Sequence, residues 1–130
     1  MALIPTLTIQ DSTTFSDEIN FSVTDSLTVT APSQGLTTII ATATGGNHII
    51  IPAGTAIAYL FVRHTGTTDG TTGTAQLVDV EESGGAAFAR LGAGEWMFMP
   101  FNHHAGNVSI HLHVQHASVV QMEYAYWTKG

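Results

Sequence analysis

The chain has 130 residues, of which 10% are charged and none is cysteine, and its formal net charge is −7 with histidine neutral. This length suits a single domain whose core needs no disulfide or metal, and the lack of cysteine excludes disulfides, thiolate metal sites and cysteine nucleophiles. Duplex nucleic acid is bound mainly through lysine and arginine. The three scattered cations Arg63, Arg90 and Lys129 therefore argue against direct binding of DNA or RNA.

The apolar runs of the chain are too short for a membrane span. Pro52, Gly54 and Thr55 interrupt the most hydrophobic run, residues 49–62, whereas a spanning helix needs about 20 apolar residues. The first eight residues lack the positive segment and the long apolar segment of a secretory signal. We therefore expect no membrane insertion and no export by this route, and a protein made in the cytoplasm of its host.

The first 17 residues predict an extended N-terminal arm. The arm holds few apolar side chains, and they lie close together: Leu3, Ile4, Leu7 and Ile9. In residues 18–30 apolar residues then alternate with polar ones, which is the period of a half-buried strand. The prediction is an arm over residues 1–17 and a β-sandwich domain over residues 18–130.

The rest of the chain consists of short β-branched and aromatic runs separated by glycine, proline and small polar residues. This pattern predicts an all-β fold, a single antiparallel β-sandwich of jelly-roll type with eight or nine strands and no helix. The expected strands are residues 18–30, 36–43, 48–51, 55–64, 75–80, 86–91, 95–101, 108–114 and 119–127. The polar stretch 65–73 has no apolar residue, so we expect it to be the solvent-exposed tip of a hairpin.

The histidines are the main chemical feature of the sequence. Five lie close together: His103, His104, His111, His113 and His116. Two histidines separated by one residue on a strand point to the same face, which suits metal chelation. If residues 108–114 and 119–127 form the last hairpin with Leu112 beside Met122, His111 lies opposite Glu123. His111, His113 and Glu123 would then form a two-histidine, one-carboxylate metal set.

This set invites comparison with the cupins, which bind metal through His-x-His followed closely by glutamate. Here Glu123 comes ten residues after His113, too far for that pattern. We therefore expect the histidines to be structural and the chain to hold no metal, and a cupin-like metal enzyme remains the rival function from another class.

No other group of residues predicts catalysis. No serine lies in a Gly-x-Ser-x-Gly turn. Asp79 and Glu81 share one face of a strand and could act as paired carboxylates, but acids are common on the solvent side of a strand. Residues 65–73 contain no lysine and precede no predicted helix, which excludes a P-loop. The expectation is a protein without catalytic residues or a cofactor.

The strand at residues 95–101 is apolar on both faces. Trp96 and Phe98 share one face, and Met97, Met99 and Phe101 share the other. A sheet with one solvated face has polar outward residues, and exposed apolar patches mark interfaces. Either the arm or another subunit therefore covers this strand, or the strand is an internal one in a distorted barrel. The predicted interface residues are Leu3, Ile4, Leu7, Met97, Met99 and Phe101.

Three segments carry a resemblance to a known group of proteins. They are residues 58–63 (AYLFVR), residues 88–101 (FARLGAGEWMFMPF) and residues 122–127 (MEYAYW). A polar loop follows the first segment, the second contains a glycine–glutamate turn and an apolar strand with a proline near its end, and the third is rich in aromatic residues. In these features the chain resembles small β-sandwich structural proteins of tailed-bacteriophage particles. It differs from them in having Gly92-Ala93 where they frequently have proline. The resemblance implies capsid decoration or cement, or a tail component, without catalysis or cofactor.

The expected function is therefore a non-enzymatic virion structural protein. It would cement or decorate the surface of a capsid as a symmetric oligomer, a homotrimer, with the major capsid protein or other virion proteins as partners. A phage tail or adaptor subunit is the alternative within this class. A carbohydrate-binding sandwich is a further alternative, for which the stacking candidates would be Trp96, Trp127, Tyr124 and Tyr126.

Overall fold

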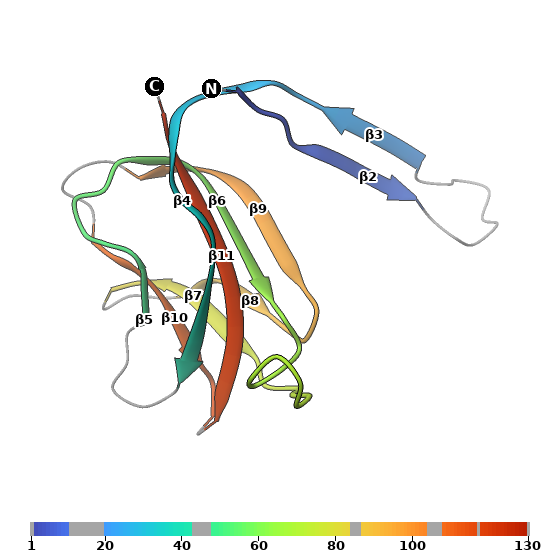
Figure 1. The fold of residues 1–130 in the computed structure, drawn as a ribbon, viewed down its shortest axis with the longest axis vertical. Coiled ribbons are helices and arrows are strands. Elements are labelled where there is room, and N and C mark those ends of the chain that lie inside the picture. Colours follow the sequence, from blue (N-terminus) through green and yellow to red (C-terminus); the bar gives the residue numbers. More distant parts are fainter. Residues whose placement is uncertain are drawn as a thin grey trace.

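The computed structural model describes residues 2–10, 20–42, 48–83, 87–103, 108–116 and 118–129, and every regular element in these ranges is a β-strand (Figure 1). The strands are β1 (Ala2–Leu3), β2 (Thr6–Gln10), β3 (Asn20–Thr24), β4 (Leu27–Thr42), β5 (His48–Ile51), β6 (Ile57–His64), β7 (Val78–Glu82), β8 (Ala87–Leu91), β9 (Trp96–His103), β10 (Ile110–Val114) and β11 (Val119–Lys129). Within these ranges there is no helix that could cross a membrane.

Two antiparallel sheets pack face to face and form the body of the protein (Figure 1). The five-stranded sheet has the order β1-β4-β11-β6-β9, and the four-stranded sheet has the order β5-β10-β7-β8. All paired strands run antiparallel. The all-β, sandwich-like architecture expected from the period-two pattern is therefore confirmed.

The core lies between these sheets and is built mainly from alternate residues of their strands, with the consecutive Ile50 and Ile51 at the end of β5 as an exception. Its members are Ala41, Ile50, Ile51, Leu60, Val62, Val78, Val80, Leu91, Ile110, Leu112, Val114, Val120, Met122, Tyr124 and Tyr126. Burying a large apolar side chain stabilises the fold by about 1.5–3 kcal/mol. Because strand residues alternate between faces, the residues between these core positions point away from the core, and they decide what each outer face can do.

The predicted last hairpin is wrong. β10 pairs with β5 and β7 in one sheet, whereas β11 pairs with β4 and β6 in the other. Leu112 and Met122 are both completely buried, but they reach the core from opposite sheets. Alternation shows which side of a strand is buried; it does not show whether the next strand joins the same sheet.

Residues 65–73 are also not the tip of a hairpin, because β6 and β7 belong to different sheets. The stretch instead continues along β11 beyond the end of β6: the Gln121 amide donates to the Thr67 carbonyl at 2.8 Å. Its base is held by the buried His64, whose Nδ1 accepts from the Gly66 amide at 2.9 Å. Nε2 therefore carries the proton and donates to the Gln76 carbonyl at 2.8 Å. Through these two bonds the buried His64 holds the start of the loop between β6 and β7, at Gly66, close to its end, at Gln76.

The N-terminal segment forms a hairpin that projects from the sandwich (Figure 1). Among the described strands β2 pairs with β3 alone, and hydroxyl contacts link Thr6 to Thr24 at 3.0 Å and Thr8 to Ser22 at 3.2 Å. Residues 20–24 were expected in the sandwich, but they pair with the segment predicted as an extended arm. Residues 11–19 lie outside the described ranges. The two-residue β1 joins this hairpin to the edge of β4.

Candidate functional site

The outer face of the five-stranded sheet carries a row of aromatic side chains. On β6, Leu60 and Val62 are buried in the core, so Tyr59 and Phe61 point outward. Their Cα partners on β9 are Pro100 and Phe98. Trp96 lies further along β9, and Trp127 of β11 pairs with Tyr59. The aromatic residues of these three strands form a surface that we name the aromatic face. Its members are Tyr59, Phe61, Trp96, Phe98 and Trp127.

The aromatic face is ordered by its own ring contacts and is partly open to solvent, with Trp96 exposed and its other members half-buried. The Tyr59 and Phe98 rings stack with their centroids 6.0 Å apart, and Trp127 meets Phe98 edge-on at 6.2 Å. Trp96 is 54% exposed. Its edge strand β9 contains Pro100, which has no N–H to offer to another strand. The face therefore offers side-chain contacts to a partner more readily than strand pairing.

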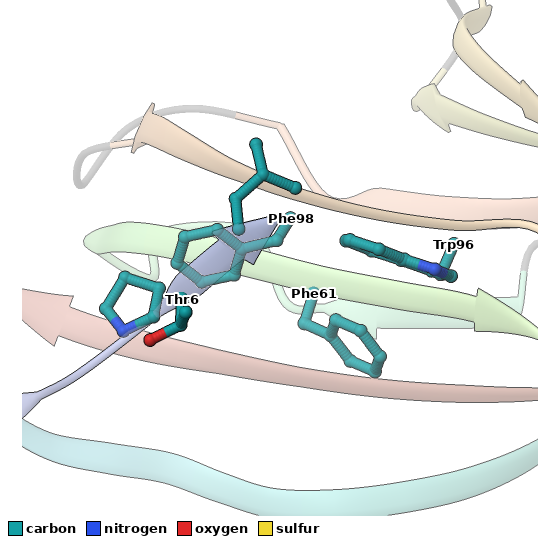
Figure 2. A pocket seen from close by; sticks show the side chains of 6 residues that line it. Thr6, Phe61, Trp96 and Phe98 are labelled. Carbon is teal, nitrogen blue, oxygen red and sulfur yellow. The ribbon is translucent and has the colours of Figure 1, made fainter. Parts of the chain in front are cut away.

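Two hollows lie on this face. One, of about 250 Å³, lies where the root of the hairpin meets the sheet, and Thr6, Phe61, Trp96 and Phe98 surround it together with Pro5 and Leu7 (Figure 2). The other, of about 460 Å³, is lined by Phe61, Arg63, Gly94 and Trp96. Arg63 lies 3.6 Å from Glu123, which balances its charge. The lining is thus mainly apolar, with one compensated ion pair at its margin.

The hairpin adds a second uncovered apolar surface. Leu7 and Val23 are directly paired across β2 and β3 and are 42% and 57% exposed. Ile9 lies on the same side of β2, and Ile4, just before the hairpin, is more exposed still. We name Leu7, Ile9 and Val23 the hairpin face.

The structure places the predicted interface residues of β9 on the side of the strand that faces the core. Met97 and Phe101 pack against the core cluster, and Phe101 stacks on Phe88 at 5.3 Å. Met99 is half-buried and pairs with the buried Leu60. On the other side of β9, Trp96 and Pro100 are exposed and Phe98 is half-buried.

The three predicted interface residues of the N-terminal segment lie in or beside the hairpin. Leu3 is half-buried in β1, while Ile4 and Leu7 are exposed. Sequence reasoning missed Tyr59 and Phe61, although their alternation with Leu60 and Val62 was a usable signal.

The predicted metal set of His111, His113 and Glu123 is not brought together. Glu123 lies in the five-stranded sheet opposite Thr38 and Arg63. The two histidines lie on β10 in the other sheet. The set failed because it depended on pairing β10 with β11. Of the other clustered histidines, His104 lies outside the described residues and His116 is exposed.

Instead, β10 brings His113 to two acidic residues of β7. His113 lies opposite Asp79, and the ligand atoms of Asp79, Glu81 and His113 lie within 4.8 Å of one another. We name these three residues the outer cluster. Asp79 is 4% exposed although it points away from the core, and it is held by Arg90, whose Nε lies 2.7 Å from Asp79 Oδ1. The hydrogen bond to this carboxylate and its charge raise the pKa of Arg90 above its ordinary value.

His111 lies beside this cluster and is 1% exposed. Its Nε2 lies 2.7 Å from Ser109 Oγ, and its Nδ1 has no hydrogen-bond partner among the described residues. The sequence already showed that Asp79 and Glu81 share a face. Only the strand register could add His113 and His111 to them.

The four proposed sugar-stacking residues are divided between two environments. Trp96 and Trp127 belong to the aromatic face, but Tyr124 and Tyr126 are buried in the core. Burial, with a smaller contribution from Tyr126, raises the pKa of Tyr124 above its ordinary value. A sugar on this surface would meet Tyr59, Phe61 and Phe98 instead.

Comparison of the chain with protein-family models, with curated proteins and with solved structures finds no match.

Proposed function

We propose that this protein is a non-enzymatic structural subunit that assembles with copies of itself through the aromatic face and the hairpin face. The observation that carries the proposal is the exposure of two apolar surfaces on one small chain, since Trp96, Leu7 and Val23 are each more than 40% exposed. Large exposed apolar patches on a stable protein mark interaction sites. Neither surface carries a charge suited to nucleic acid.

The hairpin supplies the physical reason for a second copy. A two-stranded hairpin is marginally stable in water unless another element packs on it. In the described part of the chain Leu7 borders the smaller hollow, but Ile9 and Val23 of the hairpin face remain 41% and 57% exposed. Docking this face on the aromatic face of a neighbour would cover both surfaces. A contact between two different patches of the same chain is heterologous, and heterologous contacts close into rings when the rotation permits. A homotrimer is the ring we propose.

The biological setting we propose is the virion of a tailed phage. There the protein would cement or decorate the capsid surface, with the major capsid protein as partner, and a tail or adaptor subunit is the alternative position. The support is the resemblance of residues 57–127 to such proteins, the sandwich-like fold and the projecting hairpin, which could reach a neighbouring subunit. A jelly-roll order of strands and an arm that bridges subunits belong to this proposal.

The solution mass of the purified full chain tests self-assembly. The wild type is expected to be a stable oligomer, and Trp96→Asp is expected to be a monomer with an unchanged β-sheet circular dichroism spectrum. Leu77→Asp is the matched control because Leu77 is 40% exposed in the loop before β7 of the other sheet. A monomeric wild type, or a Trp96→Asp variant with wild-type mass, would contradict the proposal.

A second candidate function, carbohydrate binding, is favoured by the exposed ring of Trp96. A flat aromatic ring offers an apolar face on which a sugar ring can stack, and the larger hollow beside Trp96 also contains Arg63. Glycan-array binding by the wild type that is lost in Trp96→Ala would support this candidate. An oligomer that binds no glycan would support assembly alone.

A further inference from the structure

The outer cluster is built from two central strands of the four-stranded sheet. Val78 and Val80 of β7 are completely buried in the core, so Asp79 and Glu81 lie on the opposite face. His113 of β10 lies on this same face because Leu112 and Val114 are buried in the core. Zinc bonds to oxygen and nitrogen are about 2.0–2.2 Å long, so ligands of one ion lie about 3–4 Å apart. The three ligand atoms are already within 4.8 Å of one another, and small side-chain rotations would close the gap.

Asp79 is held in place as metal-binding carboxylates commonly are. Arg90 Nε lies 2.7 Å from Oδ1, and the Gln115 side-chain amide donates to Oδ2. Each carboxylate oxygen can accept more than one hydrogen bond or ligand contact. Hydrogen bonds to ligating carboxylates are the usual outer support of a metal site. Arg90 and Gln115 can thus fix the orientation of Asp79 while leaving it able to bind a cation.

The buried His111 is an independent sign that a polar ligand belongs beside the cluster. Its Cα partner on β7 is Glu81, and it lies on the same face of the sheet as His113. Nδ1 of this histidine is buried and has no partner in the described part of the chain. A buried polar atom left without a hydrogen bond destabilises the fold, because it has lost its contacts with water. Water bound to a cation at the neighbouring cluster would give this nitrogen a partner.

We propose that Asp79, Glu81 and His113 bind one divalent cation of the zinc class, with water at the remaining position. Two carboxylates and an imidazole form a mixed oxygen and nitrogen set, which suits zinc, whereas magnesium and calcium prefer oxygen ligands throughout. The ion would join β7 to β10 and so stabilise the sandwich. This site is on the sheet opposite the aromatic face and does not depend on the proposed assembly.

The positive charge of Arg90 should weaken the binding of a cation at Asp79. Without a cation, Arg90 neutralises Asp79, and a bound cation lies close to the same guanidinium group. Arg90→Gln keeps a donor for the carboxylate and removes the positive charge. It is expected to tighten zinc binding about thirtyfold, the effect in water of removing one unit charge about 4 Å from a doubly charged ion. An unchanged affinity would mean that the ion does not bind at Asp79 and would overturn the assignment.

The main test is calorimetric titration of the metal-free full chain with zinc chloride. One zinc ion per chain is expected, with an affinity at least about tenfold weaker in Glu81→Gln and in His113→Asn. Glu82→Gln and His116→Asn are matched controls, since both residues are exposed neighbours on the same strands or the following turn. They should bind zinc as the wild type does.

Zinc should also raise the melting temperature of the wild type, because it binds the folded chain. Magnesium at the same concentration should not. Absence of zinc binding by the wild type would overturn the proposal. Wild-type affinity in both cluster variants, or an equal stabilisation by magnesium, would overturn it as well.

Discussion

Asp69 orders a loop that has no apolar side chain to anchor it. Its Oδ1 accepts the amides of Thr71 and Thr72 at 2.9 and 2.7 Å, and its Oδ2 accepts the Thr72 hydroxyl at 3.0 Å. The backbone amide of Thr72 contributes most, followed by that of Thr71, to holding the pKa of Asp69 far below its ordinary value. Around it, Gly66 and Gly70 adopt positive φ angles of 81° and 93°, which glycine tolerates best. A polar loop can therefore be well ordered without burial.

At this residue scale we predict that loop order depends on the Asp69 carboxylate. A carboxyl group whose folded pKa is lowered adds stability above its unfolded pKa, about 3.9, and this stability is lost as the pH falls through the folded value. Hydrogen-exchange protection of the Thr71 and Thr72 amides should be complete near neutral pH, decline only below about pH 4, and disappear in Asp69→Ala at all pH values. Asp25→Ala is the control, because Asp25 accepts the Ser26 amide in a different turn. Unchanged protection in Asp69→Ala would contradict the prediction.

At the scale of elements, the strands could be predicted but their partners could not. The expected ranges 48–51 and 86–91 correspond closely to β5 and β8, because period-two burial is a local property of the chain. The assignment of β10 and β11 to different sheets depends on where a connection crosses the core. Two strands that each bury one face show the same pattern whether they are paired or opposed.

The same limit applies to the candidate sites. Asp79 and Glu81 could be recognised as a pair on one face, but His113 joins them only through the β7–β10 register. On β9 both faces are apolar, so composition could not decide whether Met97 or Phe98 points to the core. The hairpin was not expected, since the pairing of β2 with β3 joins segments on both sides of the expected boundary at residue 17.

The hairpin should be separable from the sandwich. No residue of β1, β2 or β3 belongs to the buried core among the described residues, so removal of residues 1–24 takes away none of the core side chains that the structure describes. We expect the truncated chain to keep a cooperative thermal transition and a β-sheet spectrum, and to have the mass of a monomer. Calorimetry and light scattering would measure the two properties. Loss of the cooperative transition would mean that the hairpin is part of the folding unit.

At the scale of the whole molecule, one face of β9 packs on the core and the other belongs to the aromatic face. Met97 packs on the core, while the neighbouring Phe98 lies on the aromatic face between Tyr59 and Trp127. One strand thus links the stability of the sandwich to its proposed assembly. Substitutions at adjacent positions can separate the two contributions.

We predict opposite results for Met97→Asp and Phe98→Asp. A carboxylate at position 97 would be placed against the core, and the cost of burying it should lower the free energy of unfolding by at least about 2 kcal/mol. A carboxylate at position 98 would lie on the outer face of the sheet and stay partly in water in the monomer. The main effect should therefore be loss of the oligomer, because assembly would bury the charge. Urea unfolding of each variant under dilute, monomeric conditions, together with its mass at high concentration, distinguishes the two effects. If Phe98→Asp unfolds as easily as Met97→Asp and keeps the oligomer, the aromatic face is an inner surface of the fold, and the contact between copies must lie elsewhere.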